Sequence, residues 1–247
     1  MGKTKRQYGW KPDVPDTRDL CYGAIRPALR LPKAVDLRAQ CSAVEAQGNL
    51  GSCTAQALAG HLEFLDKKID GVYTDVSRLF IYYNERVLER SVDSDSGASL
   101  RDGIKTLAKT GACAETLWPY AIAKFAARPA ARCFADARKH RIVSYHRITG
   151  LSEMTACLAE GFPFVFGISV YESFESAAVA RTGRVPMPKR SERMIGGHAV
   201  MAIGYDQSKK CLLVRNSWGA DWGLGGYFTL PFAYLDNLAA DFWTIRK

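Results

Sequence analysis

The sequence predicts an α+β protein with two lobes, a mainly helical lobe followed by a lobe of antiparallel β-strands. Between about residues 53 and 140, apolar residues recur at the spacing of a helix face. From about residue 141, short apolar runs alternate with turn residues, which is typical of strands joined by short turns. Two such lobes leave a cleft between them, and clefts of this kind are common active sites.

Composition places the chain among ordinary globular proteins. Its 247 residues are 47% hydrophobic and 24% charged, enough to bury a sizeable core. No apolar run approaches the ~20 residues of a membrane span, and the first residues show no apolar signal core. We therefore expect no contact with a membrane. The compartment stays open between the cytoplasm and export by a route that the sequence does not show.

Residues 1–31 form an N-terminal extension that differs from the rest of the chain. Three prolines and the turn-forming residues between them disfavour helix and strand. Such a segment is either a disordered arm or a strap over a groove, and the aromatic residues Tyr8, Trp10 and Tyr22 favour the strap. Our hypothesis is a short pro-segment on or near the cleft, which ends before Leu31.

Residues 32–140 are expected to form the helical lobe. A helix is predicted to begin at Cys53 and run to about Ile69. Ser77 is suited to cap a second helix that ends near residue 90, and Ser99 is suited to cap a third over residues 100–109.

Residues 141–247 are expected to form the β lobe. Ser152 is predicted to cap a short helix that ends at Glu160. The short spacing of the other elements indicates an antiparallel, barrel-like sheet. Its strands are predicted at residues 142–148, 164–170, 199–205, 212–216, 227–230 and 242–245.

Cys53 is the candidate nucleophile. In the first turn of a helix, the free N–H groups and the positive end of the helix dipole favour the thiolate, which is the reactive form of cysteine. An isolated cysteine is more often a buried small hydrophobe. The presence of Gln47 favours a catalytic role for Cys53, because a glycine-rich turn ahead of Cys53 can aim the Gln47 amide at a developing oxyanion.

The candidate base is His198, which stands beside a short apolar run bounded by glycines that is typical of a buried strand. Asn216 follows another apolar run and can orient the imidazole, while Trp218 can cover that hydrogen bond from water. The remaining histidines lack such surroundings. His61 is expected to be a packing or surface residue, and His140 and His146 are expected to be solvated or hydrogen-bonded residues at strand edges.

Three motifs in this order resemble those of the papain-like cysteine peptidases. They are Gln47–Cys53 (QGNLGSC), Gly197–Val200 (GHAV) and Asn216–Gly219 (NSWG). His198 follows Cys53 at the family's usual separation of about 130–150 residues, and Asn216 lies slightly further on. The segments Tyr8–Asp13 and Tyr82–Arg86 are most similar to the bacterial, xylellain-like branch.

The resemblance implies the papain-like fold and a cysteine endopeptidase that works through a thioester, without a metal or another cofactor. It assigns catalytic roles to Cys53, His198, Asn216 and Gln47. Two departures stand out. Leu50 replaces a cysteine that many members use in a disulfide, and Thr54 replaces the usual tryptophan after the nucleophile.

The resemblance also implies residues that bind the substrate. Gly97 and Ala98 stand where the family presents backbone to an extended peptide as an added strand, although the family prefers two glycines there. Gly197, beside the candidate base, and Trp218 are further candidates. Trp222 is expected on the leaving-group side, with a core indole as the alternative.

Seven cysteines leave one thiol after any pairing, which suits a reactive residue plus six that are either reduced or bridged. By the resemblance, Cys113 and Cys133 are a candidate disulfide. No Cys-x-x-Cys occurs, so we expect no zinc site.

The net charge of +9 raises the alternative of a polyanion-binding protein. The basic residues are dispersed and no nucleic-acid motif accompanies them, so a solvated basic surface is the simpler interpretation. We expect a monomer that acts on peptides or proteins. Two alternatives stay open on the same fold: an acyl transferase or transpeptidase, and a catalytically idle peptide-binding protein.

Overall fold

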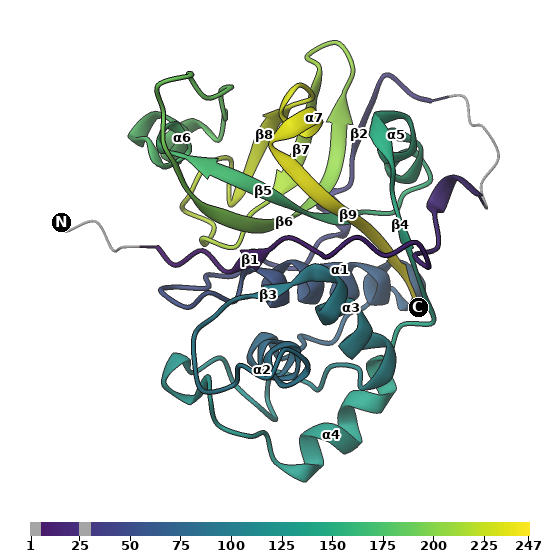
Figure 1. The fold of residues 1–247 in the computed structure, drawn as a ribbon. Coiled ribbons are helices and arrows are strands. Elements are labelled where there is room, and N and C mark those ends of the chain that lie inside the picture. The colour runs from purple at the N-terminus through teal and green to yellow at the C-terminus, as the bar shows by residue number, and fades with distance from the viewer. Residues whose placement is uncertain (1–5, 25–30) are drawn as a thin grey trace.

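The structure is a computed structural model that describes residues 6–24 and 31–247. It places a lobe of strands above a lobe of helices, with the N-terminal segment running between them (Figure 1). The fold is the α+β fold that the sequence predicts, with a helical lobe and an antiparallel β lobe.

Four helices build the lower lobe. They are α1 (Cys53–Asp70), α2 (Arg78–Leu88), α3 (Leu100–Lys109) and α4 (Ala131–Ala137). The two caps predicted in this lobe are confirmed, since the hydroxyl of Ser77 accepts from the N–H of Phe80 and that of Ser99 accepts from the N–H of Asp102.

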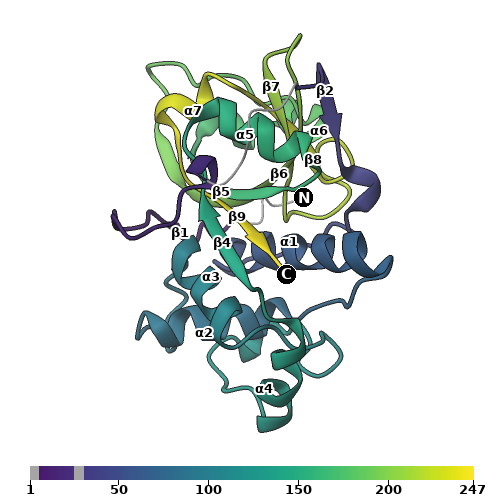
Figure 2. The ribbon, with the colours of Figure 1, turned by 90° about the vertical axis from the view of Figure 1, so that its right-hand side faces the viewer.

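Helix α1 is the shared wall of the two lobes. Every residue from Cys53 to Asp66 is buried, because α1 packs against the sheet on one side and against α2 and α3 on the other (Figure 2). A helix that is buried all round is held rigidly by its neighbours. The first residue of α1 is therefore a fixed position in the fold.

The upper lobe is a seven-stranded antiparallel sheet in the order β4-β9-β5-β6-β7-β8, with β2 also paired to β6. Three short helices accompany it: α5 (Gly150–Ala159), α6 (Ala177–Thr182) and α7 (Tyr234–Asn237). The strands are β2 (Ala34–Asp36), β4 (Ser144–Arg147), β5 (Phe164–Tyr171), β6 (Met194–Asp206), β7 (Cys211–Arg215), β8 (Tyr227–Pro231) and β9 (Ala239–Arg246).

Three details differ from the sequence-based expectation. The stretch that opens the expected helical lobe belongs to the sheet, because β2 pairs with β6. The helix expected to be capped by Ser152 begins at Gly150, where the N–H of Thr149 is bonded by the Glu153 carboxylate at 2.7 Å. His198 lies inside the long strand β6 rather than at its mouth, because the two glycines before it pair with β5 and extend the strand.

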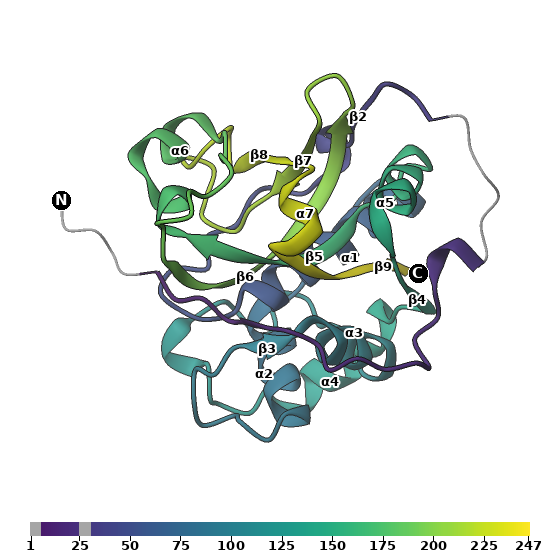
Figure 3. The same ribbon diagram turned by 45° about the horizontal axis from the view of Figure 1, so that its top comes forward.

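Residues 6–11 lie between the lobes, and we call them the strap. They include β1 (Trp10–Lys11), which pairs in parallel with β3 (Ala98–Ser99) at the edge of the helical lobe. Figure 3 shows the strap passing between β6 and β3. The strap therefore contacts both lobes.

The segment after the strap is anchored in the fold. The carboxylate of Asp13 accepts hydrogen bonds from the N–H of Arg101 at 3.1 Å and from the indole of Trp243 at 2.8 Å. Asp19 pairs with the Arg101 guanidinium at 2.5 Å. The buried carboxylate and the buried ion pair fix where the strap enters the cleft.

Candidate active site

Cys53 is the first residue of α1 and is completely buried. The turn ahead of it is held from the helical lobe, because the Asp95 carboxylate accepts from the N–H of Gly51 at 3.0 Å and from the phenol of Tyr82 at 2.5 Å. The backbone N–H groups of Ala199 and Gly9 donate hydrogen bonds to the Cys53 sulfur. Since Ala199 follows His198 in the chain, the thiol lies beside the candidate base.

The imidazole of His198 is oriented as the sequence predicts. Its Nε2 lies 2.8 Å from Oδ1 of Asn216, which also accepts from the N–H of Ser217 at 2.9 Å. Because Oδ1 accepts, Nε2 carries the proton and Nδ1 is the nitrogen left for the thiol. Trp218 stacks on the imidazole, with ring centres 5.0 Å apart at 26°, and covers the bond from water.

The hydrogen bond expected between Cys53 and His198 is not formed in this state. Within the described residues, Nδ1 of His198 is buried without a hydrogen-bond partner. The sulfur is instead bonded by backbone N–H groups, one of them from Gly9 of the strap. The strap therefore occupies part of the space around the thiol that the resting pair would use.

Burial also removes the charges expected on this pair. It raises the pKa of the Cys53 thiol to about 11, although the backbone N–H donors work in the opposite direction. It lowers the pKa of His198 to about 4 against the raising effect of Asn216. Both groups are therefore neutral at pH 7 while the strap is in place, whereas the sequence favoured a thiolate at Cys53.

Gln47 is anchored on one side and engaged by the strap on the other. Its Oε1 accepts from the hydroxyl of Ser217 at 2.7 Å, and its Nε2 donates to the carbonyl of Leu50 at 2.9 Å. The same Nε2 lies 3.4 Å from the carbonyl oxygen of Gln7. A carbonyl of the strap therefore occupies the place at the Gln47 amide where the oxyanion of a reaction intermediate would bind.

The strap crosses the site at close range. The carbonyl of Gly9 accepts from the N–H of Ala98 at 2.7 Å. A Cβ on Gly9 would lie 1.7 Å from the carbonyl oxygen of Gly51, so only glycine fits this crossing. The indole of Trp10 lies so close to Gly167 and Gly197 that a Cβ on either would overlap the strap residue.

The predicted substrate-binding residues fall into two groups. Gly97, Ala98 and Gly197 line the path of the strap, as expected for positions that meet an extended chain. Trp222 does not, because it is 5% exposed and packs edge-on behind Trp218, with ring centres 5.0 Å apart. Trp222 therefore supports Trp218 from the core and does not face a substrate.

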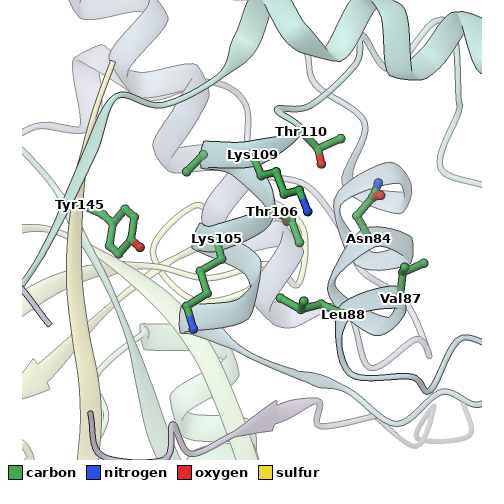
Figure 4. A pocket seen from close by; sticks show the side chains of 9 residues that line it. Asn84, Val87, Leu88, Lys105, Thr106, Lys109, Thr110 and Tyr145 are labelled. Atoms are coloured by element: carbon green, nitrogen blue, oxygen red, sulfur yellow. The ribbon is translucent and has the colours of Figure 1, made fainter. Parts of the chain in front are cut away.

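Two large hollows lie on different parts of the molecular surface. One of about 460 Å³ adjoins the site and is lined by residues that include Arg6, Glu175 and Trp218. Another, of about 550 Å³, lies on the helical lobe, with Leu88 and Lys105 among its lining residues (Figure 4). No predicted site residue lines this second hollow.

Sequence reasoning missed residues that support the site. Ser217 fixes the Gln47 amide, and its place inside the Asn-Ser-Trp-Gly motif was the available signal. Thr54, noted only as a departure, donates to the buried carboxyl of Glu85 at 2.8 Å. Burial raises the pKa of Glu85 well above its usual value.

The other titratable candidates stay outside the site. His61 is buried in α1, and His140 lies 3.7 Å from the carboxylate of Asp66. In the described part of the chain no group of three metal-ligating side chains comes together. No described helix is long and apolar enough to cross a membrane.

All seven cysteines are free thiols in this structure. Cys113 and Cys133 are buried, and their side chains are hydrogen-bonded to each other. The two residues implied as a disulfide are therefore neighbours, in the reduced state.

Comparisons with known proteins agree with this geometry. The model of the papain family cysteine protease matches residues 31–234. An uncharacterized peptidase C1-like protein of Acanthamoeba polyphaga mimivirus is 42% identical over 98% of this chain and 87% of its own. The crystal structure of xylellain, a cysteine protease from Xylella fastidiosa, is 38% identical, with a TM-score of 0.90 over 100% of this chain and 99% of that one.

A more distant structure shares the fold. Digestive procathepsin L 3 of the Tenebrio molitor larval midgut is 18% identical, with a TM-score of 0.71 over 93% of this chain and 76% of that one. The family match and the full-length similarity to xylellain establish a cysteine peptidase that acts on protein or peptide substrates. The chain belongs to the papain family of cysteine proteases.

Proposed function

We propose that this peptidase is an endopeptidase whose N-terminal strap holds it inactive until the strap leaves the cleft. The observation that carries the proposal is the position of the strap. Its Gln7 carbonyl lies at the Gln47 amide, and its Gly9 N–H bonds the Cys53 sulfur. A substrate needs both of these places.

Endo-action follows from the length of chain that the cleft holds. The strap extends past Cys53 in both directions, from Arg6 beside Trp218 to Lys11 beside Ser99. A cleft that accommodates a continuous chain on both sides of the thiol has room for the interior of a polypeptide.

The chemistry begins when the strap leaves. We assign the nucleophile to Cys53 and the base to His198, whose Nδ1 takes the thiol proton and favours the ion pair in the opened, hydrated cleft. The thiolate attacks the scissile carbonyl carbon. The resulting oxyanion is bonded by Nε2 of Gln47 and the N–H of Cys53.

The same imidazole completes the reaction. His198 gives its Nδ1 proton to the leaving amine as the thioester forms, and then takes a proton from the water that hydrolyses the thioester. Asn216 keeps Nε2 engaged throughout and so fixes the ring. Trp218 shields that bond from competing water.

The direction of the strap supports inhibition rather than self-cleavage. We assign Gly97 and Ala98 to the acyl half of a substrate and Trp218 to the side of the leaving amine. A substrate would then run from β3 toward Trp218, but the strap runs from Trp218 toward β3. Its peptide bonds are presented in reverse to Cys53.

Labelling with an epoxide inhibitor that alkylates active-site thiols tests both parts of the proposal. We expect slow labelling of the full chain, fast labelling when residues of the strap are substituted, and no labelling of Cys53→Ser. Peptide hydrolysis should rise in parallel with labelling. Fast labelling without hydrolysis would indicate the idle peptide-binding alternative.

Product analysis with an added amine nucleophile separates a hydrolase from a transferase, because both form the same thioester. We expect the free acid to be the main product. Gel filtration should give a monomer, and labelling should be unchanged by RNA or by lipid vesicles.

A further inference from the structure

The strap places a basic side chain in the hollow next to the active site. The guanidinium carbon of Arg6 lies 3.9 Å from the centre of the Trp218 ring, at the distance of a cation–π contact. The hollow has a volume of about 460 Å³ and is lined by Arg6, Ala46, Gly48, Glu175, Ala177, Ala180 and Trp218.

Glu175 is the one acidic residue among the described residues that line this hollow. Its carboxylate accepts a hydrogen bond from the phenol of Tyr8, which is itself a strap residue. When the strap leaves, Glu175 loses this donor but still lines the same hollow as Trp218. A carboxylate next to an indole is a site for a cation.

The indole face is held in place before any ligand arrives. Trp218 meets Phe174 edge-on, with ring centres 5.4 Å apart at 88°, and meets Trp222 edge-on at 5.0 Å and 84°. His198 stacks on it. The remaining wall residues are small, which leaves room for a long side chain in the hollow.

We propose that, in the open cleft, this hollow binds a basic side chain of the substrate on the leaving-group side of the scissile bond. Arginine fits best, because its planar guanidinium stacks on Trp218 and Glu175 supplies the counter-charge. The inference rests on the proposed function, which fixes the side of the cleft. Arg6 then holds the place of a substrate side chain, although the strap backbone runs the other way.

Hydrolysis of matched peptides by the full chain carrying Trp10→Ala, which loosens the strap, tests the preference. The peptides carry arginine or its neutral isostere citrulline at the first or second position after the scissile bond. At one of these positions we expect kcat/KM to be about tenfold higher for arginine, from a cation–π contact plus one ion pair. Equal values at both positions overturn the inference.

Two further substitutions in that background locate the effect. Glu175→Gln should reduce the arginine preference to about threefold, because only the stacking contact is left. Glu172→Gln is the matched control, since its carboxylate pairs with Arg193 at 2.7 Å and does not line the hollow. The Glu172→Gln variant should keep the full preference for arginine over citrulline. Equal loss in both variants contradicts a role for Glu175.

A binding measurement separates this inference from the proposed function. In the full chain carrying Arg6→Ala and Tyr8→Ala, N-acetyl-arginine amide should shift the indole resonance of Trp218, and the citrulline analogue should not. This shift without cleavage of any peptide would overturn the peptidase mechanism and leave the cation site standing. Cleavage without arginine preference and without a shift would overturn the cation site alone.

Discussion

Replacing Trp10 by alanine should open the cleft of the full-length chain. Trp10 is 9% exposed, and its ring lies against the backbone of β5 and β6 at Gly167 and Gly197. Truncating a buried aromatic residue costs about 3–5 kcal/mol. The substitution should destabilise the docked position of the strap, because the segment from Asp13 onward keeps its own hydrogen bonds to the fold.

The expected magnitude follows from that cost. If Cys53 reacts only when the strap is open, the labelling rate is the opening equilibrium constant multiplied by the rate of the exposed thiol. A loss of about 3–5 kcal/mol raises this constant by roughly 10²–10⁴-fold. Iodoacetamide labelling followed by mass spectrometry of the peptide that contains Cys53 measures the rate separately from the other six cysteines.

Val14→Ala provides the matched control. Val14 is 78% exposed and follows the strap outside the cleft, so its replacement should leave the labelling rate within about twofold. Thermal unfolding of each variant checks that the fold is intact. If Trp10→Ala is labelled at the wild-type rate while the fold is intact, the strap does not control access to Cys53.

The pKa shifts predict how the closed state depends on pH, and the thiol pair predicts an effect of oxidation. Since burial raises the pKa of Cys53 to about 11, labelling of the wild-type chain should climb from pH 9 to 11, whereas Trp10→Ala should reach its plateau at lower pH. The pKa of His198, about 4, lies below its ordinary value. In a Cys53→Ser chain, where no thiolate can pair with the imidazole of the open cleft, closure should therefore be fully favourable above about pH 6.5 and should weaken as the pH falls toward 4. Hydrogen exchange of the Ala98 N–H in that chain, corrected for its intrinsic rate, should accelerate over that interval. Oxidation that joins Cys113 to Cys133 should raise the free energy of unfolding by about 3 kcal/mol, measured by denaturant titration with and without reductant.

Each of these expectations can be contradicted by a specific result. A labelling profile of the wild-type chain that levels off near pH 7 would show that burial does not govern the thiol. An exchange rate of the Ala98 N–H that follows only its intrinsic pH dependence would remove the link to His198. For the disulfide, Cys133→Ser should abolish the effect of oxidation, and Cys211→Ser should keep it, because Cys211 is a half-exposed thiol on β7.

The helical lobe and the positions of the catalytic candidates could be predicted because their signals are local. Ser77 and Ser99 cap the helices that follow them, and Cys53 starts α1, because caps and apolar spacing act within a few residues. The Asn216 contact with His198 was also predicted, from a histidine and an asparagine that each stand beside an apolar run typical of a strand.

Other features depend on partners far apart in the sequence. The early strand β2 joins the sheet through β6, about 170 residues later, and no local pattern specifies that pairing. The neutral state of Cys53 arises from its burial by segments distant in the sequence. One of them is the strap, whose path is set by contacts with Ala98 and Glu175. Trp222 was expected on the leaving-group side with a core indole as the alternative, and its stacking on Phe174 agrees with the alternative.

The central claim is that Cys53, with His198 as its base, carries the acyl group of the substrate. Rapid-quench mass spectrometry of full-length Trp10→Ala mixed with a peptide ester tests this claim directly. We expect an acyl adduct on the peptide that contains Cys53, formed in the first turnover and absent from the same chain with His198→Ala. Hydrolysis of the ester by a Cys53→Ser chain at an undiminished rate, or an acyl adduct on another residue, would contradict it.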